Sequence, residues 1–142
     1  MVDDAIVADK LRLVNEYTDD LREIRHGLSK EEYFEDVIVQ RAVERTFVNL
    51  IQCCIDLAQH IRASEVSTPA DTAKQEIQAL GDVGVITPAV QERMEDAVGF
   101  RNVLVHRYST IDHDSVYEVL QEDLHWFEQF QQEVALWLQE NG

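Results

Sequence analysis

Glycine and proline are scarce in this sequence, with five glycines and two prolines among 142 residues. A sheet-rich fold with many tight turns needs more of both, because they supply the backbone angles of those turns. No apolar run approaches the roughly 20 residues that cross a membrane as a helix. The N-terminal stretch is acidic and continues into helical periodicity, which is unlike a signal peptide. We therefore expect a helical, cytoplasmic protein with no membrane partner.

Cysteine is equally scarce, occurring only as the adjacent pair Cys53 and Cys54. Neighbours on a helix point in different directions, so these two cannot form a normal disulfide with each other. No histidine lies at a spacing suited to share a metal ion with them. We expect both to be core or near-core residues, and we predict neither a metal site nor a cofactor.

Basic side chains, lysine above all, are outnumbered by acidic ones. The chain has 28 Asp and Glu against 12 Lys and Arg, a net charge of −16. Only three of the basic residues are lysines. An acidic, lysine-poor surface favours solubility in concentrated salt. This suggests the hypothesis that the protein comes from a halophilic organism. Such a charge repels nucleic acid at low ionic strength. In molar salt the Debye length is only about 3 Å, so the overall repulsion is screened and local arginine contacts determine whether RNA binds.

Apolar residues recur with helical period in long segments separated by short breaks. The first expected helix ends near Gly27, and Ser29 with Glu32 forms a capping box for the second. Thr68-Pro69 and Thr87-Pro88 each pair an N-cap with a first helical residue. The expected helices run from Asp3 to about His26, Ser29 to about Arg62, Pro69 to about Leu80, Pro88 into residues 100–108, and Asp112 to about Gln139.

This succession predicts an all-α protein with one domain over residues 1–142. No low-complexity tract, internal repeat or interdomain linker interrupts the chain. Long helices joined by short loops pack most readily as antiparallel neighbours. We expect an antiparallel four-helix-type bundle with an additional short helix.

The stretch FRNVLVHRY, residues 100–108, carries more polar chemistry than a buried helix segment needs. Arg101 and His106 are five residues apart, which turns their side chains about 140° from each other on a regular helix. They would converge only if the helix loosens near His106 or if two subunits meet at a two-fold axis. With nine Arg and five His in the chain, chance supplies about 0.3 such pairs, so the bare spacing is weak evidence. Asn102 and Tyr108 make the full pattern R-N-x3-H-x-Y far rarer.

Simpler interpretations of these residues stay open. Arg101 and His106 could complement the dipole at a helix C-terminus, and Tyr108 could pack on the last helix. We interpret the Val103-Leu104-Val105 run as the anchor that packs the helix end. Surface or packing roles, rather than contacts with RNA, are the simpler interpretation of three further residues: Arg107, Trp126 and Trp137.

The pattern near the end of the penultimate long helix resembles the HEPN superfamily, and more narrowly the HepT-like toxins of the MntA/HepT toxin–antitoxin systems. The resemblance covers most of the chain. It extends over the segments SKEEYF, RAVERTFVNLIQCCIDLAQHI, LGDVGVI, GFRNVLVHRY and IDHDSVYEVL. It implies a toxin of a type VII-like pair, a metal-independent endoribonuclease whose site lies at a homodimer interface and whose substrate is tRNA or mRNA.

The resemblance also implies roles for the motif residues. Arg101 and His106 match the catalytic positions, and Asn102 would support them. A histidine can move protons at neutral pH, and an arginine can hold a phosphate through two hydrogen bonds. The implied partner is an MntA-like nucleotidyltransferase antitoxin that transfers AMP to Tyr108. A bulky anionic group two residues from His106 would block the cleft and repel RNA phosphate.

Two other functions remain open at this point. The chain could be a non-catalytic helical module that docks on a nucleotidyltransferase and keeps the motif as its interface. It could also be a partner-binding four-helix bundle with no link to nucleotides. A cleavage assay separates the first of these from the ribonuclease.

Overall fold

Seven α-helices and one short 3₁₀ helix make up the computed structural model, which describes residues 2–66 and 68–141. Within these residues there is no β-strand, and no helix is both long and apolar enough to span a membrane. The helices are α1 (Asp4–Arg25), α2 (Lys30–Glu35), α3 (Val37–Glu65), α4 (Ala73–Asp82), α5 (Pro88–His106), η1 (Tyr108–Thr110), α6 (His113–Glu122) and α7 (Leu124–Asn141).

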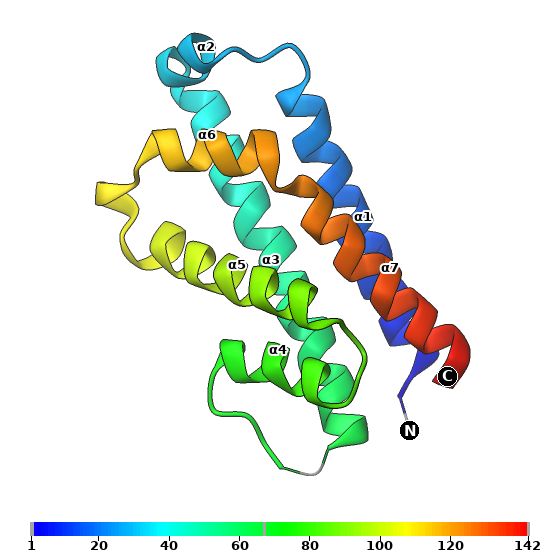
Figure 1. Cartoon of the computed structure of the whole chain (residues 1–142). Helices are drawn as coiled ribbons and strands as arrows, with labels where there is room; N and C mark the ends of the chain where they lie inside the picture. Colours follow the sequence, from blue (N-terminus) through cyan, green and yellow to red (C-terminus); the bar gives the residue numbers. More distant parts are fainter. Residues whose placement is uncertain (1, 67, 142) are drawn as a thin grey trace.

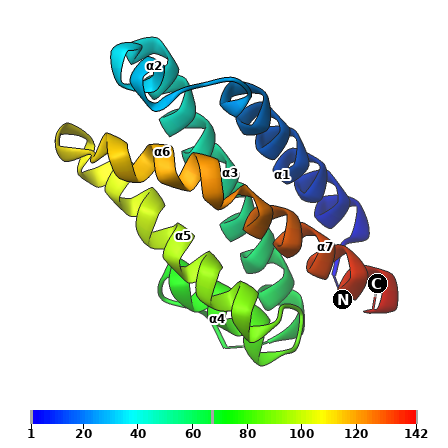
Figure 2. The ribbon, with the colours of Figure 1, turned by 45° about the horizontal axis from the view of Figure 1, so that its top comes forward.

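The four long helices alternate in direction, as an antiparallel bundle requires. Figure 1 shows α3 in the middle, with α1 and α7 on one side and α5 and α4 on the other. The short helices α2 and α6 close one end of the bundle, and the view in Figure 2 shows the same arrangement. The prediction of an all-α antiparallel bundle is confirmed, while its dimerisation stays a prediction.

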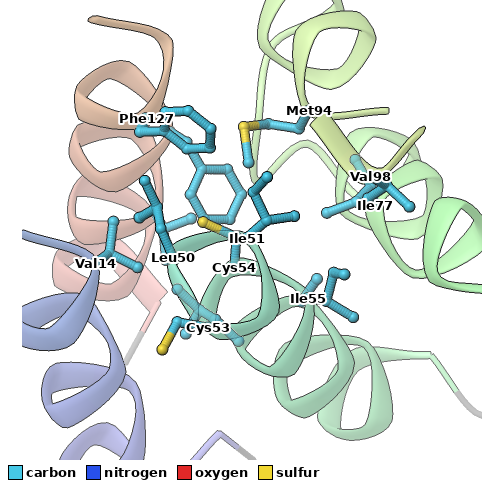
Figure 3. Packing of buried hydrophobic residues seen from close by; sticks show 14 of the residues in the cluster. Val14, Leu50, Ile51, Cys53, Cys54, Ile55, Ile77, Met94, Val98 and Phe127 are labelled. Atoms are coloured by element: carbon cyan, nitrogen blue, oxygen red, sulfur yellow. The ribbon is translucent and has the colours of Figure 1, made fainter. Parts of the chain in front are cut away.

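The core lies where α1, α3, α5 and α7 meet. Figure 3 shows their apolar side chains converging on one interior, among them Val14 from α1, Ile51 from α3, Met94 from α5 and Phe127 from α7. All four are almost completely buried. Helix α3 packs against α1, α4 and α5, and α7 packs against α1 and α5 to complete this interior.

Both cysteines lie in this core, as predicted. Cys53 and Cys54 are buried and unpaired. Burial raises the pKa of the Cys53 thiol, and raises that of the fully buried Cys54 thiol well above its usual value. Their placement therefore favours packing over thiol chemistry.

The single helix expected from Ser29 onward is wrong, because the chain leaves helical geometry at Asp36. Asp36 has φ −113° and ψ 96°, and its carboxylate accepts a hydrogen bond from the Val39 amide at 3.1 Å. The Gln40 side chain donates to the Tyr33 carbonyl at 3.0 Å. This bond satisfies one of the carbonyls freed at the end of α2, so the break leaves few polar groups unpaired.

The last expected helix is also divided, at Asp123. Leu120 and Leu124 on either side are both buried, so the apolar period runs through the break without interruption. The Tyr117 hydroxyl donates to the Leu28 carbonyl at 2.9 Å, which fixes α6 to the loop after α1. The apolar periodicity of the expected helix predicted its buried face correctly, but it did not predict the change of direction between α6 and α7.

The expected start of the short helix at Thr68-Pro69 is wrong by one turn. Helix α4 begins at Ala73, and the Thr72 side chain caps its first turn. A buried ion pair of 2.6 Å between Arg62 of α3 and Glu76 of α4 holds this helix in place. The first turn of α4 is therefore the turn that contacts α3 through this ion pair, and the local Thr68-Pro69 signal is not used.

Candidate active site

Helix α5 carries the FRNVLVHRY motif to its C-terminal end, as predicted. Thr87 is the N-cap and Pro88 the first helical residue. The helix stays regular through His106, and Arg107 then leaves it with φ −123° and ψ 36°. The Arg107 amide donates to the Val103 carbonyl at 2.9 Å, which closes the last turn. The motif therefore spans a helix end, where functional groups can reach solvent.

Only the middle residue of the Val103-Leu104-Val105 run anchors this end. Leu104 is 5% exposed, whereas Val103 and Val105 are 41% and 45% exposed. Successive residues on a helix point about 100° apart, so three in a row cannot all face the core. The interpretation of the whole run as an anchor is wrong, and two valines are left on the surface beside the motif.

Arg101 points from α5 to α3 and is held there by neutral groups. Its Nη1 donates to Gln52 Oε1 and its Nη2 to Asn102 Oδ1, both at 2.8 Å. Gln52 Nε2 in turn donates to Asp56 Oδ1 at 2.8 Å, and Lys10 Nζ lies 3.7 Å from Asp56 Oδ2. Because the Gln52 amide nitrogen is engaged by Asp56, its oxygen is the atom that faces Arg101.

This arrangement leaves the positive charge of Arg101 without a direct counterion. Among residues 2–66 and 68–141, no carboxylate lies within 4.0 Å of its guanidinium. Its buried Nε has no hydrogen-bond partner in the same part of the chain. The charge is thus oriented but not neutralised, which suits a group that holds a phosphate. The helix-dipole interpretation fits His106, in the last turn, better than Arg101.

His106 lies apart from Arg101 within one chain. Its side chain is exposed, and no hydrogen bond joins the two residues in the described part of the structure. Since α5 is regular through His106, loosening of the helix does not bring them together. Of the two routes considered from the sequence, only convergence across two subunits remains, and it stays a prediction.

Tyr108 begins the 3₁₀ helix η1 and packs on α3, not on the last helix. Its side chain is 58% exposed. The Arg41 guanidinium lies 5.2 Å from the centre of its ring, within cation–π distance. A groove of about 420 Å³ adjoins this pair, and its walls are Arg41, Glu44, Arg45, Val48, Leu104, Val105 and Tyr108.

A buried acidic group underlies the groove. The Glu44 side chain is 8% exposed and accepts hydrogen bonds from Arg41 Nη1 at 3.2 and 3.3 Å. His113 Nδ1 lies 3.7 Å from the same carboxylate. Burial, with the charge of Glu44 as a second cause, raises the pKa of the neighbouring Tyr33. Glu44 therefore fixes the position of Arg41 from below.

The groups that this end of the bundle presents are a guanidinium, an imidazole and a phenol. Among residues 2–66 and 68–141, no three His, Cys, Asp or Glu side chains are grouped so that they could hold a metal ion. Residues 14–134 match the model of the family described as Ribonuclease HepT-like. The chain belongs to the ribonuclease HepT-like family.

Relatives of this HepT-like chain include two curated nucleases. The tRNA nuclease HepT of Aphanizomenon flos-aquae is 28% identical over 116 residues, which cover 82% of this chain and 78% of that protein. The mRNA nuclease HepT of Shewanella oneidensis is 28% identical over 99 residues, which cover 70% and 74%.

The fold is shared with a solved toxin structure. The tri-AMPylated Shewanella oneidensis HEPN toxin in complex with MNT antitoxin superposes with a TM-score of 0.86 at 24% identity, covering 94% of this chain and 98% of that one. At this identity the likeness establishes the fold, and the resemblance to HEPN proteins stated from the sequence is confirmed by the family match.

Three residues of the candidate site were not identified from the sequence: Gln52, Arg41 and Glu44. All lie on α3: Gln52 and Arg41 contact Arg101 and Tyr108, which come about 50 to 70 residues later, and Glu44 holds Arg41. One signal was present. Arg41, Arg45 and Gln52 recur with helical spacing in the longest helix, a polar stripe that an apolar partner helix would not require.

Proposed function

We propose that this HepT-like chain is the toxin of a type VII-like toxin–antitoxin pair and acts as a metal-independent endoribonuclease. The observation that carries the proposal is the Arg101 guanidinium, at the helix end that exposes His106. Gln52 and Asn102 orient it, and no carboxylate of the described residues pairs with it. The two curated relatives bear the names tRNA nuclease and mRNA nuclease, so the substrate is proposed to be one of these RNAs.

In the proposed reaction, the ribose 2′-oxygen forms a bond to phosphorus and the bond from phosphorus to the 5′-oxygen breaks. One imidazole accepts the 2′-hydroxyl proton, and a protonated imidazole gives a proton to the leaving 5′-oxygen. Arg101 stabilises the charge that develops on the phosphate oxygens. Asn102 supports Arg101 through the hydrogen bond of 2.8 Å.

The two proton transfers are the reason for proposing a homodimer. Each chain contributes one His106, and a two-fold axis supplies two copies of both motif residues. Val103 and Val105 are both exposed within one turn of His106, which supports an isologous contact through this helix end. The active unit is then a single helical domain, residues 1–142, acting as a cytoplasmic dimer.

The proposed antitoxin is an MntA-like nucleotidyltransferase that modifies Tyr108. The phenolic oxygen forms a bond to the α-phosphorus of ATP, the bond to the β-phosphate oxygen breaks, pyrophosphate leaves, and the phenolic proton passes to solvent. The exposed position of Tyr108 supports its role as acceptor. The related Shewanella oneidensis HEPN toxin, which is tri-AMPylated and in complex with MNT antitoxin, supports the same chemistry.

An RNA cleavage assay tests the enzyme, run with tRNA and mRNA in the salt that the protein needs. We expect the wild type to cleave and His106→Ala and Arg101→Ala to lose cleavage while keeping their helical content. If wild type and His106→Ala leave RNA equally intact, the chain is instead a non-catalytic module that binds a nucleotidyltransferase. The charge of −16, which opposes RNA binding, favours that second function.

The modification is tested separately by intact mass after incubation with ATP and the cognate transferase. We expect the wild type to gain AMP and Tyr108→Phe to gain none. Equal gain by both proteins would exclude Tyr108 as the acceptor.

A further inference from the structure

The groove beside Tyr108 concentrates cationic charge on a strongly acidic protein. Arg41 and Arg45 lie one turn apart on α3 and both line the groove. The whole chain has only 12 basic residues against 28 acidic ones. Two arginines in one small depression, where most of the surface is anionic, indicate a local preference for an anionic ligand.

Neighbouring groups fix the position of Arg41 and leave some of its N–H donors without a partner among the described residues. Its Nη1 bonds to buried Glu44, and its guanidinium lies over the Tyr108 ring. An arginine has five N–H donors, and the bonds to Glu44 use only those on Nη1. Within residues 2–66 and 68–141 the donors on Nε and Nη2 make no hydrogen bond, so they can bind a ligand beside the Tyr108 phenol.

Arg45 supplies a second positive group at the same groove. It is exposed, and it has no ion pair or hydrogen bond within residues 2–66 and 68–141. Arg41 and Glu44 compensate each other, so Arg45 leaves the groove with one net positive charge. That charge matches a phosphodiester, which carries one negative charge at neutral pH, and arginine binds phosphate oxygens through paired N–H groups.

The size and walls of the groove suit the rest of a nucleotide. Its volume of about 420 Å³ lies within the roughly 300–1,000 Å³ of small-molecule pockets. Val48, Leu104 and Val105 form an apolar wall next to the arginines. An apolar wall beside a cationic one fits a flat base joined to a phosphate.

We propose that Arg41 and Arg45 bind the phosphate that AMP transfer attaches to Tyr108, so that the groove is the receptor for the adenylyl group. This inference rests on the proposed modification of Tyr108. It adds a consequence for RNA binding: Arg41 and Arg45 are available to RNA phosphate in the unmodified protein and become unavailable once the phosphodiester of the modified protein occupies them. The modification then closes a phosphate site in addition to placing bulk near His106.

The test follows AMP on and off Tyr108 in four proteins: wild type, Arg41→Gln, Arg45→Gln and Arg93→Gln. Arg93 is the matched control, since it is exposed and its guanidinium lies 5.1 Å from the Trp126 ring centre, away from the groove. Intact mass gives the rate of AMP addition by the cognate transferase. A phosphodiesterase added to each modified protein gives the rate of AMP removal, and circular dichroism confirms that each variant is folded.

We expect Arg41→Gln and Arg45→Gln either to slow AMP addition or to speed its removal by about tenfold, with Arg93→Gln like wild type. Arg41→Lys, which keeps the charge without the fork of donors, is expected to fall between Arg41→Gln and wild type. Equal addition and equal removal in all four proteins would overturn the inference. If the wild type gains no AMP, the proposed modification itself fails, and the inference fails with it.

A second measurement separates the adenylyl phosphate from RNA phosphate. Unmodified protein in a His106→Ala background is titrated with a short single-stranded RNA at several salt concentrations. An effect of the Arg41 and Arg45 substitutions confined to RNA affinity, with AMP addition and removal unchanged, would make the groove an RNA contact and contradict the inference.

Discussion

Gln52 and Arg101 are joined by a hydrogen bond of 2.8 Å that links the middle of α3 to the motif on α5. The bond is directional, because Asp56 engages the Gln52 amide nitrogen and leaves the oxygen for Arg101. Gln52 therefore orients the Arg101 guanidinium, and we propose that it acts on cleavage through Arg101.

Replacing Gln52 by alanine is expected to lower the rate of RNA cleavage about tenfold with little change in KM. The guanidinium keeps its charge but loses its orientation, and small misplacements of a charge-stabilising group reduce kcat. Gln129→Ala is the control. Like Gln52, Gln129 donates a hydrogen bond to a carboxylate four residues later in the chain, Glu133, but it lies on α7. Equal cleavage rates for Gln52→Ala and Gln129→Ala would show that Gln52 does not position Arg101 for cleavage.

Helix α4 is predicted to depend on the Arg62–Glu76 ion pair. The side chains are 12% and 9% exposed, so replacing Arg62 by alanine leaves a buried carboxylate without its partner. We expect a loss of about 3 kcal/mol in the free energy of unfolding, measured by urea denaturation. Arg12→Ala breaks an exposed pairing with Asp9 and Glu16 and is the control, expected to leave the urea midpoint close to that of the wild type.

The end of α5 is predicted to depend on Leu104 alone. Leu104→Ala opens a cavity in the core and is expected to reduce stability by about 2–4 kcal/mol. Val105→Ala, one residue on and 45% exposed, should change the unfolding free energy of the monomer by less than about 1 kcal/mol. Similar losses in the two variants would show that the whole apolar run anchors the helix.

Stability is predicted to fall at alkaline pH because of Cys54. Its folded pKa lies well above the unfolded value of 9.0, so below pH 9 the thiol is neutral in both states and has no effect. Above pH 9 the unfolded chain releases the proton first, which favours unfolding with a slope that grows toward roughly 1 kcal/mol per pH unit for one thiol. Denaturant unfolding between pH 8 and 10 measures this slope.

Cys54→Ala is the control for that slope. It lowers stability at all pH values through lost packing, yet its decline between pH 9 and 10 should be shallower than that of the wild type. Parallel pH profiles for the two proteins would assign the alkaline loss to other groups.

Local signals in the sequence were sufficient wherever backbone chemistry decides the structure. The Ser29 capping box, the Thr87-Pro88 helix start and the helix end around His106 are all present as predicted. These features depend on residues within one turn of each other. The helical class and the buried cysteines follow from periodicity and composition in the same way.

Local signals failed where distant segments compete. Apolar periodicity continues through Asp36 and Asp123, so it could not show where α3 and α7 change direction to pack on α1. Asp36 caps the new helix at the first of these breaks, since the Val39 amide donates a hydrogen bond to its carboxylate. Thr68-Pro69 was a plausible start that the chain does not use.

The motif follows from the sequence alone: it specifies which side chains stand at the end of α5, and that Arg101 and His106 point about 140° apart on a regular helix. The surroundings of these side chains depend on how the helices pack. That packing places Gln52 against Arg101 and Arg41 over Tyr108, through contacts between α3 and the chain around α5. The reason is physical: helix geometry relates residues a few positions apart, whereas the packing of α3 against α5 depends on the whole core.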